Sequence, residues 1–160
     1  MSSTIRFIAD LHLGHVNMAK KRGFNSIEDH DNLIIENWNS VVNKRDVTYI
    51  LGDITMEKKS PYHLLDKLNG IKHVVLGNHD RHQDIVELLK HVHSVSGMIK
   101  YKGFFLTHCP IHPIEIENGR VMGNIHGHVH ENIIEDSKYY CVSCEEVNYT
   151  PVSFIDLYIK

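Results

Sequence analysis

Apolar and polar positions divide the first half of the chain into alternating strand-like and helix-like segments. Three short segments of mostly apolar residues are predicted strands: residues 5–9, 47–51 and 72–76. Three segments with helical spacing or helix-start signals are predicted helices: residues 26–42, 60–69 and 84–90. In the first of these helices Ser26 is the expected N-cap, and Asp29 follows three residues later. The βαβαβα order predicts parallel strands joined by crossover helices.

After residue 92 the predicted elements become shorter and mostly strand-like. Four short strands separated by Gly or polar turns are expected there: residues 95–101, 104–107, 121–126 and 139–142. The segment 151–160 fits either a strand or a helix. We expect mostly antiparallel pairing in this half, and a single α/β domain over residues 1–160.

Composition excludes several classes of protein. Of the 160 residues, 42% are apolar and 23% are charged, as in globular domains rather than in disordered chains or coiled coils. The net charge of −3 provides no global cationic field for nucleic acid or membrane. No apolar run approaches the ~20 residues of a membrane helix. Three cysteines without a signal-peptide pattern favour the reducing cytoplasm.

Fourteen histidines are the exceptional feature of the composition, and several lie where a predicted strand ends. The polar residues at these ends are Asp10, His12, Asp53, Asn78, His79, Asp80 and His108. Because the carboxyl ends of parallel strands converge on one crevice, we expect these side chains to meet there. Seven other histidines, including His30, are expected to be solvated surface residues.

A further group of histidines lies in residues 124–130. If this segment is extended, its alternation places His126, His128 and His130 on one side, and Gly127 permits a close approach or a sharp turn. Together with the strand-end residues, this is a set of nitrogen and oxygen ligands without thiolate. Such a set suits Mn, Fe, Co, Ni or Zn better than Ca or Mg. The candidate ligands outnumber the needs of one ion, which predicts two metal ions that share a bridging carboxylate.

These motifs, in this order, resemble the ordered blocks of the calcineurin-like metallophosphoesterases. The resemblance extends from residue 5 to about 130 and rests on Asp10-x-His12, Gly52-Asp53, Gly77-Asn78-His79-Asp80, His108 and Gly127-His128-x-His130. Small single-domain members from bacteria and bacteriophages are similar in Asp10-Leu-His-Leu-Gly-His15-x-Asn17, Trp38-Asn39 and Asn148-Tyr149-x-Pro151-Val152. The resemblance implies two packed mixed β-sheets flanked by helices. It also implies a cytoplasmic protein, in the host cell if the chain is of phage origin.

The resemblance assigns a role to each strand-end residue. One metal ion would be bound by Asp10, His12 and His130. The other would be bound by Asn78, His108 and His128, with Asp53 bridging the two. His79 would assist phosphate-ester cleavage without binding metal, and Asp80 would orient it. The ions would be divalent transition metals, with Mn as the first choice and Fe, Ni, Co or Zn as the alternatives.

Three further residues are candidates for substrate binding: His15, Asn17 and His126. His15 follows Asp10 by five residues, as in relatives that share the Asp-x-His-x-x-His pattern. His126 fits a position behind the metal ligands better than one on the substrate. The serine/threonine protein phosphatases of this superfamily carry an Asp-Arg-Gly and a Glu where this chain has other residues, which disfavours a phosphoprotein substrate.

The charge of such a site indicates its chemistry. Two divalent cations outweigh the negative charges of Asp10 and Asp53, so an anionic phosphate ester is attracted despite the chain's net charge. The same cations lower the pKa of bound water towards ~7. We therefore expect a phosphoesterase that hydrolyses phosphodiesters by in-line attack of a metal-bridging hydroxide. A small phosphodiester or a nucleotide is the expected substrate.

Two other functions are compatible with the sequence. A nuclease, or an RNA-end or cyclic-nucleotide phosphodiesterase, would use the same site, although the basic clusters at residues 20–22 and 58–59 are typical of solvated surface. A non-catalytic scaffold of the same fold is disfavoured, because such members usually lose ligands. Cys141 and Cys144 are spaced like a redox or zinc pair, but on a strand they would point to opposite faces. Cys109 is expected only to border the site.

Overall fold

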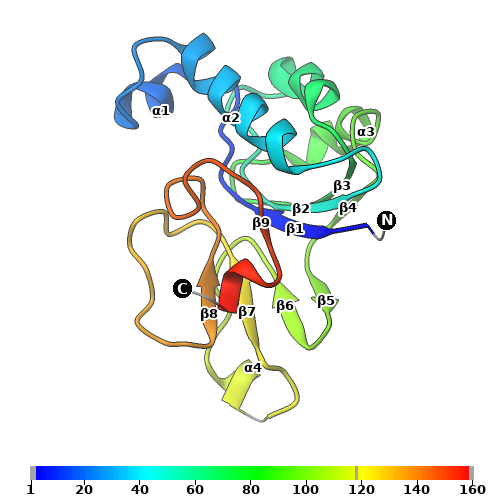
Figure 1. Ribbon diagram of the computed structural model, residues 1–160, viewed down its shortest axis with the longest axis vertical. Coiled ribbons are helices and arrows are strands. Elements are labelled where there is room, and N and C mark those ends of the chain that lie inside the picture. Colours follow the sequence, from blue (N-terminus) through cyan, green and yellow to red (C-terminus); the bar gives the residue numbers. More distant parts are fainter. Residues whose placement is uncertain (1–2, 118, 159–160) are drawn as a thin grey trace.

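The computed structural model describes residues 3–117 and 119–158, and its first sheet has five strands (Figure 1). Their order across the sheet is β4–β3–β2–β1–β9. The strands are β1 (Ile5–Ile8), β2 (Val47–Leu51), β3 (Ile71–Val75), β4 (Ser94–Ser96) and β9 (Val152–Ser153). Neighbours among β1 to β4 run parallel, and β9 runs antiparallel to β1. The parallel sheet predicted for the first half of the chain is confirmed.

The second sheet has four strands in the order β5–β6–β7–β8. They are β5 (Ile99–Tyr101), β6 (Phe104–Leu106), β7 (Gly123–His126) and β8 (Tyr139–Cys141). Only the pair β5–β6 is antiparallel, whereas β6, β7 and β8 run parallel to one another, so the prediction of a mostly antiparallel second half is wrong. The reason lies in the connections. A tight turn joins β5 to β6, which gives an antiparallel pair. The connections from β6 to β7 (residues 107–122) and from β7 to β8 (residues 127–138) are long enough to bring the chain back to the start of a parallel strand.

One predicted strand, residues 95–101, is in fact two strands that belong to different sheets. β4 ends at Ser96 on the edge of the first sheet, and β5 begins at Ile99 on the edge of the second. Gly97 lies in the short connection, where the chain passes between the layers. The sequence leaves the segment 151–160 open between strand and helix, and its described part, residues 151–158, contains both the short strand β9 and a 3₁₀ turn, η3 (Asp156–Tyr158). Residues 159 and 160 lie outside the described residues.

The helices that precede β4 lie on one side of the first sheet and the second sheet lies on the other, whereas the short helix at residues 114–117 lies at the far end of the second sheet (Figure 1). The α-helices are α1 (Val16–Lys21), α2 (Ile27–Val41), α3 (Ile85–Leu88) and α4 (Ile114–Glu117). The remaining 3₁₀ segments are η1 (Ser60–Lys67) and η2 (His82–Asp84). Ser26 caps α2 as predicted, since its Oγ accepts a hydrogen bond of 3.0 Å from the main-chain N–H of Asp29. The helices α1 and α4 have only one or two turns and were not predicted from the periodicity.

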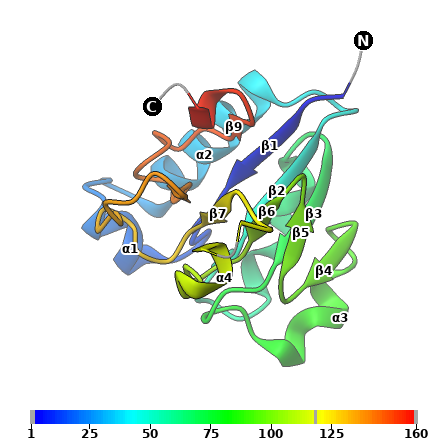
Figure 2. The ribbon, with the colours of Figure 1, turned by 90° about the horizontal axis from the view of Figure 1, so that it is seen from below.

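The two sheets share one hydrophobic core, which makes the fold an α/β sandwich. Seen from below, the strands of the second sheet lie in front of the first sheet (Figure 2). Phe154 joins the layers, because its ring lies 5.7 Å from that of Phe7 in the first sheet and 5.2 Å from that of Phe104 in the second. Ile8 and Ile125 are fully buried members of the same cluster. Within the described ranges, every helix is too short or too polar to cross a membrane.

The N-cap of α2 provides a test of the fold's local energetics. Ser26→Ala should lower the free energy of unfolding by about 1 kcal/mol, because a helix N–H loses its acceptor. Ser40→Ala is the matched control, since Ser40 is exposed near the end of the same helix and its Oγ donates to the Asn37 carbonyl. Urea denaturation followed by circular dichroism measures both. Equal stabilities of the two variants would contradict the capping role.

Candidate metal centre

The predicted ligands come together where the carboxyl ends of both sheets meet. Five loops supply these residues. Three belong to the first sheet and follow β1, β2 and β3, and two belong to the second sheet and follow β6 and β7. The residues predicted as ligands are Asp10, His12, Asp53, Asn78, His108, His128 and His130. The crevice predicted from the parallel strands thus also receives residues from the second sheet.

The first group consists of Asp10, His12 and His130. The Oδ1 atom of Asp10 lies 4.0 Å from Nε2 of His12 and 3.9 Å from Nε2 of His130. The two imidazole rings stack with their centroids 5.5 Å apart. Asp10 Oδ1 and both ring nitrogens of His12 are buried, and none of them has a hydrogen-bond partner in the described chain. Unpaired buried polar atoms are costly, so a carboxylate and an imidazole left in this state fit a metal ion between them.

The second group is built around His108. Its Nδ1–H donates to the Leu51 carbonyl at 2.8 Å, which directs Nε2 towards the site. There Nε2 lies 2.9 Å from Asn78 Oδ1 and 3.4 Å from Asp53 Oδ2. The ring of His128 packs edge-on against His108 at 5.0 Å.

Asp53 lies between the two groups, as a bridging carboxylate must. Its Oδ2 is 3.4 Å from His108 Nε2 and 3.9 Å from His12 Nε2, and its Oδ1 accepts the main-chain N–H of His79 at 3.0 Å. Asp10 is held in the same way, because its Oδ2 accepts from Ser143 Oγ at 2.6 Å and from the His128 N–H at 2.9 Å. Each carboxylate therefore keeps one oxygen fixed by donors and turns the other towards the histidines.

The backbone is strained at these ligands. Nine non-glycine residues in the described chain have positive φ, and five of them are predicted ligands: Asp10, His12, Asp53, His128 and His130. Such conformations cost about 1–3 kcal/mol each and persist only where the surroundings impose them. Their concentration at one place is typical of a functional site rather than of a purely structural one.

His126 does not face the same way as the other two histidines, so that expectation is wrong. The extended segment ends at His126, and the positive φ of 72° at His128 turns the chain. The fully buried ring of His126 lines a separate cavity of about 390 Å³ together with Tyr139 and Cys141. Its Nδ1–H donates to the Gly127 carbonyl at 2.9 Å.

His15 and Asn17, the other two candidates for substrate binding, lie at the start of α1. His15 Nδ1 is 2.7 Å from Glu57 Oε1, and the imidazole is 14% exposed. Asn17 is exposed on the first turn of α1. Contact of either residue with a substrate stays a prediction.

His79 and Asp80 are not partners, which corrects the expected orienting role. The carboxylate of Asp80 accepts from three main-chain N–H groups, those of Asp53, Ile54 and Gly77, at 2.8–3.0 Å. Asp80 therefore fixes the loops that carry Asp53 and Asn78. The imidazole of His79 is 39% exposed, with Nε2 4.0 Å from Asp53 Oδ2.

Arg22 and Glu145 support the first group and were missed from the sequence. Arg22 donates to the carbonyls of Asp10 at 2.7 Å and Leu11 at 3.3 Å, and its Nε donates to Glu145 Oε1 at 2.8 Å. Glu145 in turn accepts from His130 Nδ1–H at 3.1 Å, which leaves His130 Nε2 for a metal. The expectation that the basic cluster at residues 20–22 is solvated surface is wrong for Arg22, whose side chain is only 2% exposed.

His30 is buried as well, so its assignment to the solvated surface is wrong. Its Nδ1–H donates to Asp31 Oδ1 at 2.8 Å, and its Nε2 accepts from Arg22 Nη1 at 2.9 Å. Asp31 also accepts the Gly14 N–H at 3.0 Å. The α2 residues His30 and Asp31 thereby brace the loop that carries Asp10 and His12.

Burial and neighbouring charges shift the pKa values differently in the two groups. Burial, aided by the charge of Arg22, lowers the pKa of His12 to about 3, so its imidazole is neutral and its nitrogen lone pair is available. Burial alone would raise the pKa of Asp53 and lower that of His108. Their mutual hydrogen bond and charge attraction outweigh it, so the pKa of Asp53 is lowered and that of His108 is raised. Burial raises the pKa of Asp10.

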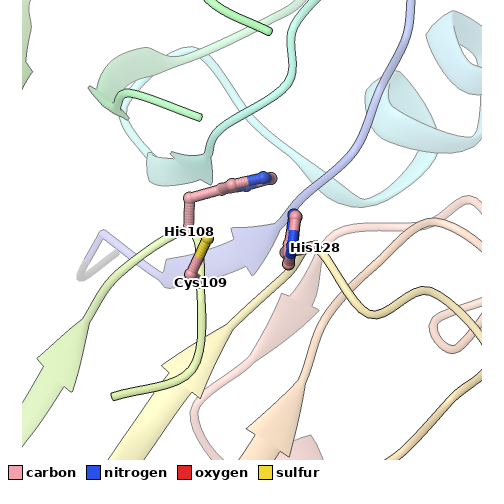
Figure 3. Close-up of side chains that lie close together, drawn as sticks. All are labelled: His108, Cys109 and His128. Carbon is pink, nitrogen blue, oxygen red and sulfur yellow. The ribbon is translucent and has the colours of Figure 1, made fainter. Parts of the chain in front are cut away.

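Of the three free cysteines, Cys109 belongs to the site (Figure 3). Its Sγ and one nitrogen each of His108 and His128 lie within 4.8 Å of one another. Cys141 and Cys144 do not converge, as predicted, because Cys141 lines the cavity beside His126 and Cys144 is buried in the core. Burial raises the pKa of Cys144 to about 12, which makes it inert.

Comparisons with known proteins agree with this fold and leave the chemistry open. The chain is 34% identical, over 171 aligned positions, to the uncharacterized protein MJ1445 of Methanocaldococcus jannaschii, with 98% of this chain and 89% of that protein covered. The chain therefore belongs to the family of that protein. No protein-family model matches it.

A viral protein and a solved structure are also similar. The Gene 66 protein of Mycobacterium phage L5 is 39% identical over 79 residues, which cover 46% of this chain and 38% of the phage protein. The crystal structure of the Protein of Unknown Function AQ665 from Aquifex aeolicus aligns with a TM-score of 0.75 and 26% identity, and the alignment covers 99% of both chains. The whole α/β sandwich is thus shared with a solved structure.

A test of the site's packing comes from Gly77, which touches the carboxylate of Asp53. A Cβ at this position would collide with Asp53 Oδ1, and the φ of Gly77 is not positive, so the close approach is what requires glycine. Gly77→Ala should lower the free energy of unfolding by about 1–3 kcal/mol. Gly97→Ala, where an added Cβ meets nothing within 4 Å, should stay within about 0.5 kcal/mol of the native protein. Urea denaturation measures the free energy of unfolding of both variants, and an unchanged stability of Gly77→Ala would contradict the described contact.

Proposed function

We propose that the protein is a binuclear metal-dependent phosphoesterase of the calcineurin-like metallophosphoesterase superfamily, acting on phosphodiesters. The observation that carries the proposal is the meeting of the seven predicted ligands from five loops, with buried, unpaired atoms at Asp10 and His12. Ligand sets of this kind, rich in imidazole and carboxylate, suit divalent transition metals. Mn is our first choice, and Fe, Ni, Co and Zn are the alternatives.

The residues divide into two sets that would each hold one ion. Asp10, His12 and His130 form the first set, and Asn78, His108 and His128 form the second. Asp53 would serve both, because its Oδ2 lies within 4 Å of a histidine of each set. When bound, the two ions would polarise the phosphoryl oxygens and lower the pKa of bound water.

His79 is the residue that we assign to proton transfer. Its main-chain N–H is tied to Asp53 Oδ1, so the backbone is fixed relative to the bridging carboxylate. Its imidazole reaches towards the same carboxylate from the solvent side and stays 39% exposed. A phosphate ester entering from solvent would meet Nε2 of His79, which can hold a proton against the leaving oxygen or stabilise charge on the phosphoryl group.

The charged side chains near the site favour diesters over monoesters. Arg22 is occupied by two carbonyls and Glu145, and Arg81 is occupied by Gln83 and Asp84. Neither arginine is available to balance the second negative charge of a phosphate monoester. A small diester or a nucleotide diester therefore fits the proposal better. The three free thiols support a cytoplasmic setting.

The direct test of the function is turnover of a chromogenic diester. With added Mn²⁺, the purified protein should release para-nitrophenol from bis(para-nitrophenyl) phosphate and act more slowly on para-nitrophenyl phosphate. A chelator should abolish the activity, and added Mn²⁺ should restore it. Absence of turnover with any of the five metals, in protein that binds them, would contradict the enzymatic proposal.

A pair of variants separates catalysis from metal binding. His79→Ala should keep its metal content and lower kcat roughly 10²–10⁴-fold, because the imidazole is lost while the main-chain bond to Asp53 remains. Asp53→Asn should lose much of both metals, since it removes a charge shared by the two sets. Elemental analysis measures the metal content of both variants, and steady-state kinetics measures their kcat.

His82→Ala, at an exposed histidine three residues further along the chain, is the control for His79 and should behave as the native protein. Unchanged kcat in metal-loaded His79→Ala would exclude the assigned role.

A further inference from the structure

An exposed thiol that the ligand assignment has not used lies beside the second set. Cys109 follows His108 directly and is exposed, as is His128. Figure 3 shows the Cys109 side chain beside the rings of His108 and His128. Their ligand atoms all lie within 4.8 Å of one another, close enough for one ion to contact all three.

The main chain on both sides of Cys109 is held in place. Thr107 Oγ1 donates to the Cys109 carbonyl at 2.6 Å. Pro110 follows and restricts the backbone of the preceding residue to extended conformations. His108 is itself anchored by its bond to the Leu51 carbonyl. The thiol is therefore held on a fixed segment next to a fixed imidazole.

We propose that Cys109 is a protein ligand of the second metal ion, where its thiolate joins His108 and His128. The inference rests on the proposed binuclear centre and adds to it a sulfur ligand at one of its two positions. When the metal–sulfur bond forms, the thiol proton leaves to solvent, as it does for any thiol that a divalent cation binds.

A thiolate changes which metal the second position prefers. Asp10, His12 and His130 are an oxygen and nitrogen set that suits Mn²⁺. Sulfur with two imidazoles selects softer ions, so the second position should prefer Zn²⁺, Fe²⁺ or Co²⁺ to Mn²⁺. The two positions should then bind different metals from a mixture, which a purely oxygen and nitrogen centre would not require.

Cobalt spectroscopy tests the thiolate without reference to activity. The metal-free native protein is titrated with Co²⁺, and the visible d–d bands report binding while near-ultraviolet absorption reports thiolate-to-cobalt charge transfer. The native protein should show the charge-transfer band as the second position fills. Cys109→Ser should lose this band, keep the binding of Co²⁺ at the first position, and bind Zn²⁺ at the second at least about tenfold more weakly.

Matched variants and a folding check keep the result unambiguous. Cys141→Ser removes a half-buried thiol that lines the cavity beside His126, and it should retain the charge-transfer band. Circular dichroism of each variant verifies the fold. Two bound cobalt ions without the band in the native protein, or a band that survives in Cys109→Ser, would overturn the role of Cys109 and leave the proposed function standing. Absence of stoichiometric cobalt binding would overturn both.

Discussion

The joining of the two sheets at Ala9 is the interaction on which the site depends. The Ala9 N–H donates to the Val142 carbonyl at 2.8 Å, and the Cys144 N–H donates to the Ala9 carbonyl at 3.1 Å. The Val142 N–H in turn donates to the His126 carbonyl at 2.8 Å, at the end of β7. This short ladder places Asp10, the residue that follows Ala9, beside the loop that carries His128 and His130. Gly127 makes the approach possible, because a Cβ there would collide with Ala9 and crowd Asp10. The ladder acts together with the bonds from His108 to the Leu51 carbonyl and from the His128 N–H to Asp10, which also join ligand loops of the two sheets.

A second layer of charges then holds the ligands in their strained conformations. Arg22 bonds the carbonyls of Asp10 and Leu11, and Glu145 ties Arg22 to His130. Burial would raise the pKa of Glu145, but its bonds to His130 and Arg22 lower that pKa to about 2, so the carboxylate stays charged at neutral pH. A buried pair of this kind contributes little net stability, but removing one partner is costly because it leaves a buried charge. Its evident use is to fix positive φ angles at Asp10, His12 and His130, which the chain would not adopt alone.

The parts that could be predicted from the sequence are those that local patterns determine. Spacing and turn residues within a few positions determine the Ser26 cap, the parallel strands of the first sheet and the placement of the candidate ligands at strand ends. The division of residues 95–101 between two sheets and the parallel order of β6 to β8 depend on where long loops return, which no local pattern records. No local pattern records the contact between Arg22 and Glu145 either, because these residues are 123 positions apart in sequence. The role of Asp80 is equally hidden, because its partners are backbone groups. The predicted direction of His126 is wrong because side chains alternate between two faces only while the chain stays extended, and the chain turns at His128.

The central claim is that two metal ions sit at the junction of the sheets with Asp53 between them. Anomalous diffraction from crystals soaked with Mn²⁺ or Zn²⁺ measures this directly. The account predicts two peaks, one among Asp10, His12 and His130 and one beside His108, each within bonding distance of Asp53. A centre with no peak, or peaks only at surface histidines such as His82, would contradict it.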